Sequence, residues 1–158
     1  MKKITLIILL FSFATFAQSD KKDAPKFDVT SIDGTNFKLE DLKGKLIVVN
    51  IWGIWCPPCL REIPSLNQFA TQYKSNKNVV FIAFTEDNET KLAKFLKLKP
   101  FKYNIIPNST ETINMFSANM TFPMHYLINQ DGKIEVSAAG TSGFNKVKKK
   151  LREMLSKK

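Results

Sequence analysis

Cys56 and Cys59 are the only cysteines of the chain, and two prolines separate them. This spacing, at the start of a helix, allows both sulfurs to join in one reducible disulfide. A disulfide that closes so short a loop removes little entropy from the unfolded chain, so a purely structural role is disfavoured. The spacing therefore predicts thiol–disulfide exchange, with a metal site as the alternative.

Two metal ions could use these sulfurs. Structural zinc requires four ligands, and the chain adds one histidine, His125, to the two cysteines. Cu(I) suits soft thiolates, so a copper-binding metallochaperone that uses Cys56, Cys59 and His125 remains an alternative. The favoured interpretation of His125 is a strand-surface histidine without a role. We therefore expect no metal and no cofactor, because the dithiol itself carries the electrons.

The elements around the cysteines support the redox interpretation. The apolar run 45–52 predicts a strand that is buried on both faces, and apolar residues at helical spacing follow Cys59. At the start of a helix, free N–H groups and the helix dipole lower the pKa of Cys56, which makes it the nucleophile, and Cys59 resolves the mixed disulfide. Pro58 removes one such donor, so we expect a more reducing pair than a histidine-containing motif would form.

The rest of the chain alternates strands and helices. The Asp33-Gly34 turn predicts an N-terminal β-hairpin, and a second hairpin surrounds Asp131-Gly132. Further elements are predicted at 78–84 (strand), 89–98 (helix), 103–106 (strand), 111–118 (helix) and after Gly143 (helix). The prediction is an α/β fold with a mixed β-sheet flanked by helices and a strand–helix insertion between Phe84 and Phe122.

The N-terminus has the pattern of a signal peptide. Lys2 and Lys3 precede an apolar stretch, 4–16, that is shorter than the ~20 residues of a membrane-spanning helix. We expect a signal peptide at 1–17, a linker at 18–25 and one domain at 26–158. Export to a bacterial periplasm follows, and a retained membrane anchor is disfavoured. Such a compartment is oxidising, which makes disulfide chemistry meaningful.

The chain is basic, with a net charge of +10, and cleavage would remove two lysines and leave +8. Most of the lysines are scattered along the chain. One cluster lies on the last predicted helix: Lys146, Lys148, Lys149, Lys150 and Arg152. A solvated helix face is the favoured interpretation of this cluster, with acidic partners or anionic lipid as the alternative. We expect a monomer that does not bind nucleic acid.

These motifs together resemble the exported TlpA/ResA-like thiol–disulfide oxidoreductases of the thioredoxin superfamily. The resemblance covers nearly the whole chain after residue 17. The residues that carry it are Ala24-Pro25-Lys26-Phe27, Asp33-Gly34, Asp41-Leu42-Lys43-Gly44-Lys45, Trp55-Cys56-Pro57-Pro58-Cys59, Glu62-Ile63-Pro64, Phe122-Pro123 and Leu127-Ile128-Asn129-Gln130-Asp131-Gly132-Lys133-Ile134. It implies a thioredoxin-like fold.

The resemblance also implies a client-binding surface around the cysteines. The Phe122–Pro123 bond would be cis, with Pro123 facing the sulfurs and Phe122 offering backbone groups to a client strand. Trp55, Pro57 and Pro58 would border the same surface. Phe122 is bulkier than the usual family residue, and Gly53 stands where the family often has alanine.

A catalytic acid is implied as well. Glu86 follows the second core strand, where the family often carries a glutamate near the buried cysteine. A partly buried carboxyl at this place would exchange protons with Cys59. A solvated acid in the loop before a helix is the alternative interpretation.

The resemblance favours a reductant of client protein disulfides, for example in cytochrome c maturation. A membrane thiol–disulfide electron donor would reduce the protein's own disulfide again after each turnover. An oxidant that donates its disulfide is the nearest alternative. A related peroxidase would need threonine or serine three residues before its reactive cysteine, and Gly53 occupies that place.

Overall fold

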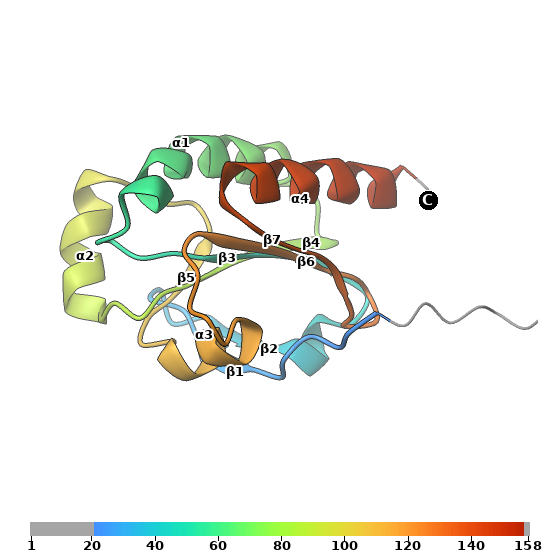
Figure 1. The fold of residues 1–158 in the computed structure, drawn as a ribbon, viewed down its shortest axis with the longest axis horizontal. Coiled ribbons are helices and arrows are strands. Elements are labelled where there is room, and N and C mark those ends of the chain that lie inside the picture. The colour runs from blue at the N-terminus through green and yellow to red at the C-terminus, as the bar shows by residue number, and fades with distance from the viewer. Residues whose placement is uncertain (1–20, 157–158) are drawn as a thin grey trace, which may run out of the picture.

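The computed structural model of the protein describes residues 21–156 (Figure 1). The predicted signal peptide and residues 18–20 of the predicted linker lie outside the described residues. In chain order the elements are β1 (Asp28–Thr30), β2 (Asn36–Lys38), the 3-10 helix η1 (Leu39–Leu42), β3 (Leu46–Ile51), α1 (Pro57–Gln72), β4 (Val79–Phe84), α2 (Glu89–Leu98), β5 (Asn104–Ile106), α3 (Thr110–Phe116), β6 (Met124–Ile128), β7 (Ile134–Ala139) and α4 (Gly140–Leu155).

The main sheet has the strand order β5-β4-β3-β6-β7. β3, β4 and β5 are parallel, since a helix crosses over between successive strands. β6 is antiparallel to both of its neighbours, β3 and β7, which confirms the predicted mixed sheet. β3 lies at the centre, and its C-terminal end is level with the start of β6, because Ile51 pairs with Met124.

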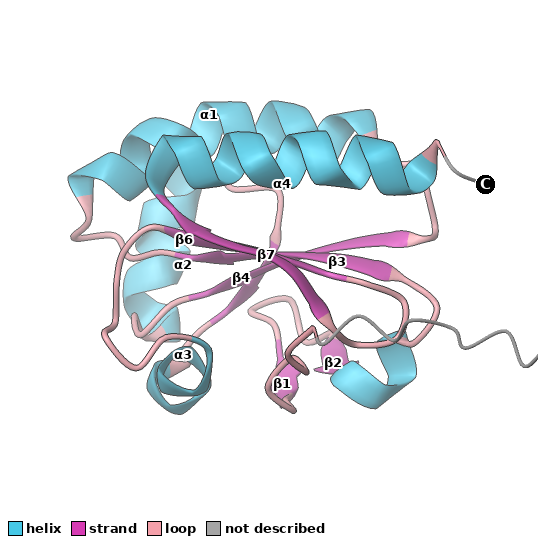
Figure 2. Ribbon diagram, turned by 45° about the vertical axis from the view of Figure 1, so that its right-hand side comes forward, coloured by secondary structure: helices cyan, strands magenta, loops and turns pink. Residues whose placement is uncertain are grey.

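Helices and the small hairpin cover both faces of this sheet, as Figures 1 and 2 show. α1 and α4 lie side by side over one face, where Leu46 and Val48 of β3 enter the core. α3 and the β1–β2 hairpin lie over the other face, where Ile47 and Val49 enter a second core. Burial on both faces explains why β3 has an uninterrupted apolar sequence.

The N-terminal hairpin forms a separate two-stranded sheet, β1–β2, as predicted. Residues 21–25, the described end of the predicted linker, lie against the turn between β6 and β7. Ala24 is buried, and its N–H donates to the carbonyl of Gly132 at 2.9 Å. Asp23 forms a β-bridge with Lys133. This part of the predicted linker is therefore packed on the domain, because Ala24 adds to its core.

The region between Phe84 and Phe122 contains α2, β5 and α3, which confirms the predicted insertion. The last helix, α4, begins at Gly140, earlier than the predicted start after Gly143. The chain turns directly from β7 into α4 at Gly140, whose φ is 63°. Gly143 lies inside the helix, so it marks close packing of the helix and not its boundary.

Candidate active site

The cysteine pair lies where β3 ends and α1 begins, as predicted. Cys56 and Cys59 form a disulfide, with their Cα atoms 5.3 Å apart. Cys56 is the N-cap residue of α1, and its Sγ accepts the backbone N–H of Cys59 at 3.3 Å. Pro57 and Pro58 occupy the first two helical positions, so neither offers an N–H group. In the reduced protein, the Cys59 N–H and the helix dipole remain to stabilise the Cys56 thiolate.

The two cysteines are covered, whereas the residues beside them are exposed. Cys56 is 3% and Cys59 2% exposed, but Trp55 is 53% exposed. The indole of Trp55 packs on Phe122, with ring centroids 5.0 Å apart. Gly53 leaves room for this indole, because a Cβ at position 53 would lie 2.7 Å from Trp55 Nε1. The aromatic contact joins the cysteine loop to the segment before β6.

Pro123 lies at the same end of the sheet. The Phe122–Pro123 bond is cis, as the resemblance implies. Pro123 is buried, and its carbonyl accepts the N–H of Gly140 at 2.9 Å. It directly precedes β6, whose first residue pairs with Ile51, the last residue of β3. The strand register therefore brings the cis-proline to the end of β3 from which the cysteine loop extends.

The loop after β4 carries two neighbouring acids, the predicted Glu86 and Asp87. Glu86 is half-buried there, and its role as proton carrier for Cys59 stays a prediction. Asp87 is buried, and its Oδ2 accepts the N–H of Ile54 and the hydroxyl of Thr85, each at 2.8 Å. Asp87 therefore holds the cysteine loop in place. The signal for Asp87 was its place in the loop that follows the apolar strand at 79–84.

A further buried acid, Glu62, lies on α1 three residues after Cys59. Glu62 is 7% exposed; its Oε1 accepts the hydroxyl of Thr141 at 2.7 Å, and its Oε2 lies 3.0 Å from His125 Nε2. Burial raises the pKa of Glu62, but the hydrogen bonds from His125 and Thr141 outweigh it and hold this pKa below its ordinary value. Glu62 is therefore held as a carboxylate.

Glu62 belongs to the motif Glu62-Ile63-Pro64 that resembles the family, but the motif by itself predicts no role for it. Residues three apart in a helix share a face, so Glu62 lies one turn along the same side of α1 as Cys59. The pKa of Tyr103 is raised, first by burial and then by the negative charge of Glu62. The i, i+3 spacing from Cys59 was the signal that could have identified Glu62 as part of the site.

His125 is buried, at 1% exposure, and the predicted surface position is wrong. β6 is an inner strand, and residue 125 faces the α1–α4 layer, where the ring of Phe144 packs against it at 5.5 Å. Its Nδ1 lies 3.3 Å from Asn50 Nδ2, and its Nε2 faces Glu62. Both ring nitrogens have protein partners, which disfavours His125 as a copper ligand. No group of three or more His, Cys, Asp or Glu within residues 21–156 could hold a metal ion.

Comparison with known proteins gives this arrangement its family. Residues 21–137 match the AhpC/TSA family. The chain belongs to the AhpC/TSA family. It is 39% identical over 126 residues to the thiol-disulfide oxidoreductase ResA of a Bacillus cereus strain, a match that covers 75% of this chain and 71% of that protein. It is 32% identical over 127 residues to ResA of Bacillus subtilis, a match that covers 78% of this chain and 69% of that protein.

Solved structures share the fold of this AhpC/TSA family member. A thiol-disulfide oxidoreductase from Bacteroides fragilis superposes with a TM-score of 0.71 at 23% identity, over 84% of this chain and 99% of that one. A thioredoxin family protein from Chlorobium tepidum gives a TM-score of 0.68 at 23% identity, over 83% of this chain and 96% of that one. The predicted thioredoxin-like fold is confirmed. This member of the AhpC/TSA family is a thiol–disulfide oxidoreductase, and Cys56 and Cys59 form its close cysteine pair.

Proposed function

We propose that the protein is an exported reductant that passes electrons from Cys56 and Cys59 to disulfides of client proteins. The observation that carries this direction is the single backbone N–H at Cys56 Sγ. A dithiol oxidises strongly when its reduced form is stabilised. One hydrogen bond to a charged group contributes about 1.5–3 kcal/mol, which corresponds to about 30–65 mV for this two-electron couple. The missing donor at Pro58 therefore lowers the reduction potential.

The exchange proceeds in two steps. The Cys56 thiolate attacks one sulfur of the client disulfide, which forms a mixed disulfide and releases a client thiolate. Cys59 then loses its proton and attacks the sulfur of Cys56, which releases the second client sulfur. The client gains two electrons, and its two thiolates take up the proton released by Cys59 and one further proton from water, while the protein is left with its disulfide. Glu86 is the proposed acceptor of the Cys59 proton, and the Glu62 carboxylate on the same side of α1 is a second candidate.

The surface beside the disulfide suits an extended client segment. Trp55, Pro57 and Pro58 are exposed there, and Phe122 packs against Trp55. In our proposal a client strand pairs with the backbone of Phe122 next to the cis-proline, so that its disulfide reaches Cys56. Apocytochrome c is the proposed client class, by resemblance to the family. A membrane thiol–disulfide protein would return the electrons.

The proposed location is the periplasm, after cleavage behind Ala17. The support is the signal-peptide pattern of residues 1–17 in the sequence. In the part of the chain that the structure describes, no helix has the length and apolar character to cross a bilayer. N-terminal sequencing of the protein from a periplasmic extract should begin at Gln18. An N-terminus at Met1 in the membrane fraction would contradict cleavage.

A glutathione redox titration of the purified mature protein tests the direction of electron flow. We expect a reduction potential well below the roughly −120 mV of a strong oxidant, together with reduction of insulin disulfides. A Cys56→Ser variant is the control and should reduce no insulin. A potential near that of the strong oxidant would reverse the proposed direction.

A further inference from the structure

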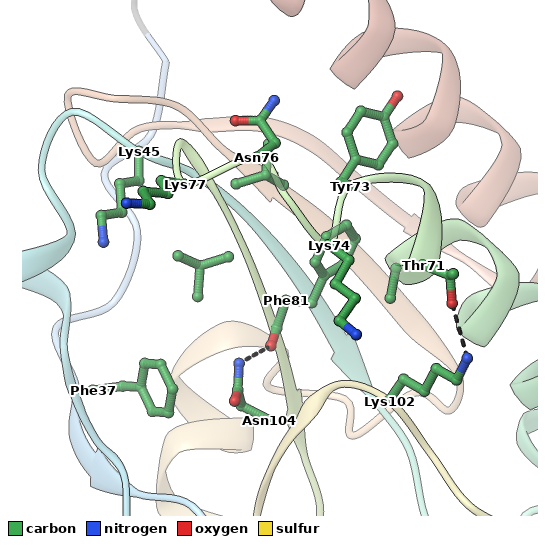
Figure 3. A pocket seen from close by; sticks show the side chains of 13 residues that line it. Phe37, Lys45, Thr71, Tyr73, Lys74, Asn76, Lys77, Phe81, Lys102 and Asn104 are labelled. Carbon is green, nitrogen blue, oxygen red and sulfur yellow. Dashed lines mark hydrogen bonds between the residues drawn. The ribbon is translucent and has the colours of Figure 1, made fainter.

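A groove lies away from the disulfide, at the end of the sheet where β3 and β4 begin, and Figure 3 shows the residues that line it. It measures about 820 Å³ and lies around the first residues of β4, between the end of α1 and the segment before β5. β3 runs parallel to β4 for six residues before the cysteine loop begins. At about 3.3 Å per residue, the groove is about 20 Å from the disulfide. It is therefore separate from the site described above.

The edge of β4 inside this groove lacks a neighbouring strand. β3 pairs with all of β4, whereas β5 pairs only with Ile82–Phe84. The carbonyl of Asn78 accepts the N–H of Leu46, the first residue of β3, at 2.8 Å. Successive residues of a strand point their backbone groups to opposite edges. The backbone groups of Val79 and Phe81 therefore point to the open edge.

One donor and one acceptor at this edge are left for a partner. The N–H of Val79 donates to the carbonyl of Asn76 at 3.2 Å, and the carbonyl of Phe81 accepts the Asn104 side chain at 2.7 Å. Within residues 21–156 the carbonyl of Val79 and the N–H of Phe81 form no hydrogen bond. These two groups have the spacing that an added strand pairs with.

The rim of the groove is positively charged. Lys45 and Lys77 lie at one end in Figure 3, and Lys74 and Lys102 lie at the other. The lining includes no acidic residue. In the described chain none of these lysines forms an ion pair, and Lys102 Nζ contacts the hydroxyl of Thr71 at 3.0 Å. The floor between the lysines is apolar and includes Val80, Phe81 and Phe37.

We propose that this groove binds an extended acidic segment of a partner protein, which adds as a short strand to the open edge of β4. Apolar side chains of the segment would contact the floor, and carboxylates would pair with the four lysines. A second copy of this chain is disfavoured because its net charge is +10. Nucleic acid or lipid head groups would use the lysines but not the free backbone groups. The proposal is independent of the direction of electron flow.

The test uses a fluorescent peptide in which glutamate and valine alternate over about eight residues, added to the mature protein and followed by anisotropy in low salt. We expect saturable binding that weakens at least about tenfold in a Lys74→Glu/Lys77→Glu double variant. The matched control, Lys146→Glu/Lys149→Glu, makes the same charge change on α4 and should bind as wild type does. Both variants should retain insulin reduction, which shows that they fold.

Two further probes separate strand addition from charge alone. A peptide with proline in place of each valine keeps the carboxylates but lacks the N–H group at every second residue and cannot pair as a regular strand, so it should bind at least about tenfold more weakly. In NMR spectra, the glutamate–valine peptide should shift the amide resonance of Phe81. The proposal would be overturned if the proline peptide bound as tightly as the glutamate–valine peptide, or if the α4 control variant lost as much affinity as the Lys74→Glu/Lys77→Glu variant. Binding of oligo-dT or anionic vesicles without binding of the peptide would also overturn it.

Discussion

Pro58 decides how many backbone donors reach the sulfur of Cys56. An N-cap side chain accepts from the second or third residue of its helix, here Pro58 or Cys59. Pro58→Ala restores an N–H group at the second position, so we expect the reduction potential to rise by about 30 mV or more. Pro57→Ala is the matched control and should shift the reduction potential less. Glutathione titration of both variants measures the difference, and equal shifts would contradict the donor argument.

The buried carboxylate of Glu62 makes stability depend on pH. Because its folded pKa is below the ordinary 4.5, its contribution is complete above about that pH and is lost as the pH falls through the folded value. We expect Glu62→Gln to lower the free energy of unfolding by about 1–2 kcal/mol at pH 7, and the gap to close at low pH. Urea unfolding at several pH values measures this.

The control for Glu62 is Glu153→Gln, a substitution of an exposed acid on α4. It should unfold like the wild-type protein at each pH, since exposed substitutions usually change stability by about 0.5 kcal/mol or less. A constant gap between Glu62→Gln and the wild-type protein down to low pH would mean that the charge of Glu62 has no role in stability.

The proposed role of Glu86 as proton acceptor can be tested through the pH dependence of Cys59 alkylation. If its carboxyl exchanges protons with this thiol, Glu86→Gln should move the pH profile of Cys59 alkylation in the reduced protein by about one pH unit. The measurement is the alkylation rate of a Cys56→Ser variant with and without the substitution. Glu89→Gln, an exposed acid at the start of α2, is the control. An unchanged profile removes Glu86 from the mechanism and leaves Glu62 as the candidate.

At the scale of the elements, the packing of α4 on β7 requires a residue without a side chain. A Cβ at Gly143 would lie 2.4 Å from the carbonyl oxygen of Ala138, a backbone atom that cannot rotate away. Gly143→Ala should therefore lower the free energy of unfolding by about 1–3 kcal/mol. Asn145→Ala on the exposed side of the same helix should change it by about 0.5 kcal/mol or less. Chemical denaturation of both variants compares them, and equal stability would contradict the steric argument.

At the scale of the whole molecule, the direction of electron flow should appear in global stability. A reducing dithiol is one whose disulfide form is favoured by the fold, whereas a strong oxidant is more stable when reduced. We expect the oxidised protein to resist guanidinium unfolding by about 2 kcal/mol more than the reduced protein. The Cys59→Ser variant cannot form the disulfide, so its free energy of unfolding should not change when reductant is added. A more stable reduced form would indicate an oxidant.

Much of the local structure followed from the sequence. The apolar run at 45–52, the Asp33-Gly34 turn and the helical spacing after Cys59 predict elements that the structure confirms. These signals are local, because strand burial, turns and helix caps depend on residues that are near one another in the chain. The redox pair was predictable for the same reason, since its two cysteines are neighbours at a helix start.

The tertiary structure decided which distant residues meet. Glu62 of α1 contacts Thr141 of α4, which is 79 positions away in the sequence. It also contacts His125 of β6, which is 63 positions away. The burial of His125 and the bond from Asp87 to the cysteine loop likewise depend on how strands and helices pack. The sequence by itself determined the redox chemistry, because that chemistry belongs to a short motif. Only packing decided the charged and buried surroundings of the cysteines, because no local pattern records which faces come together.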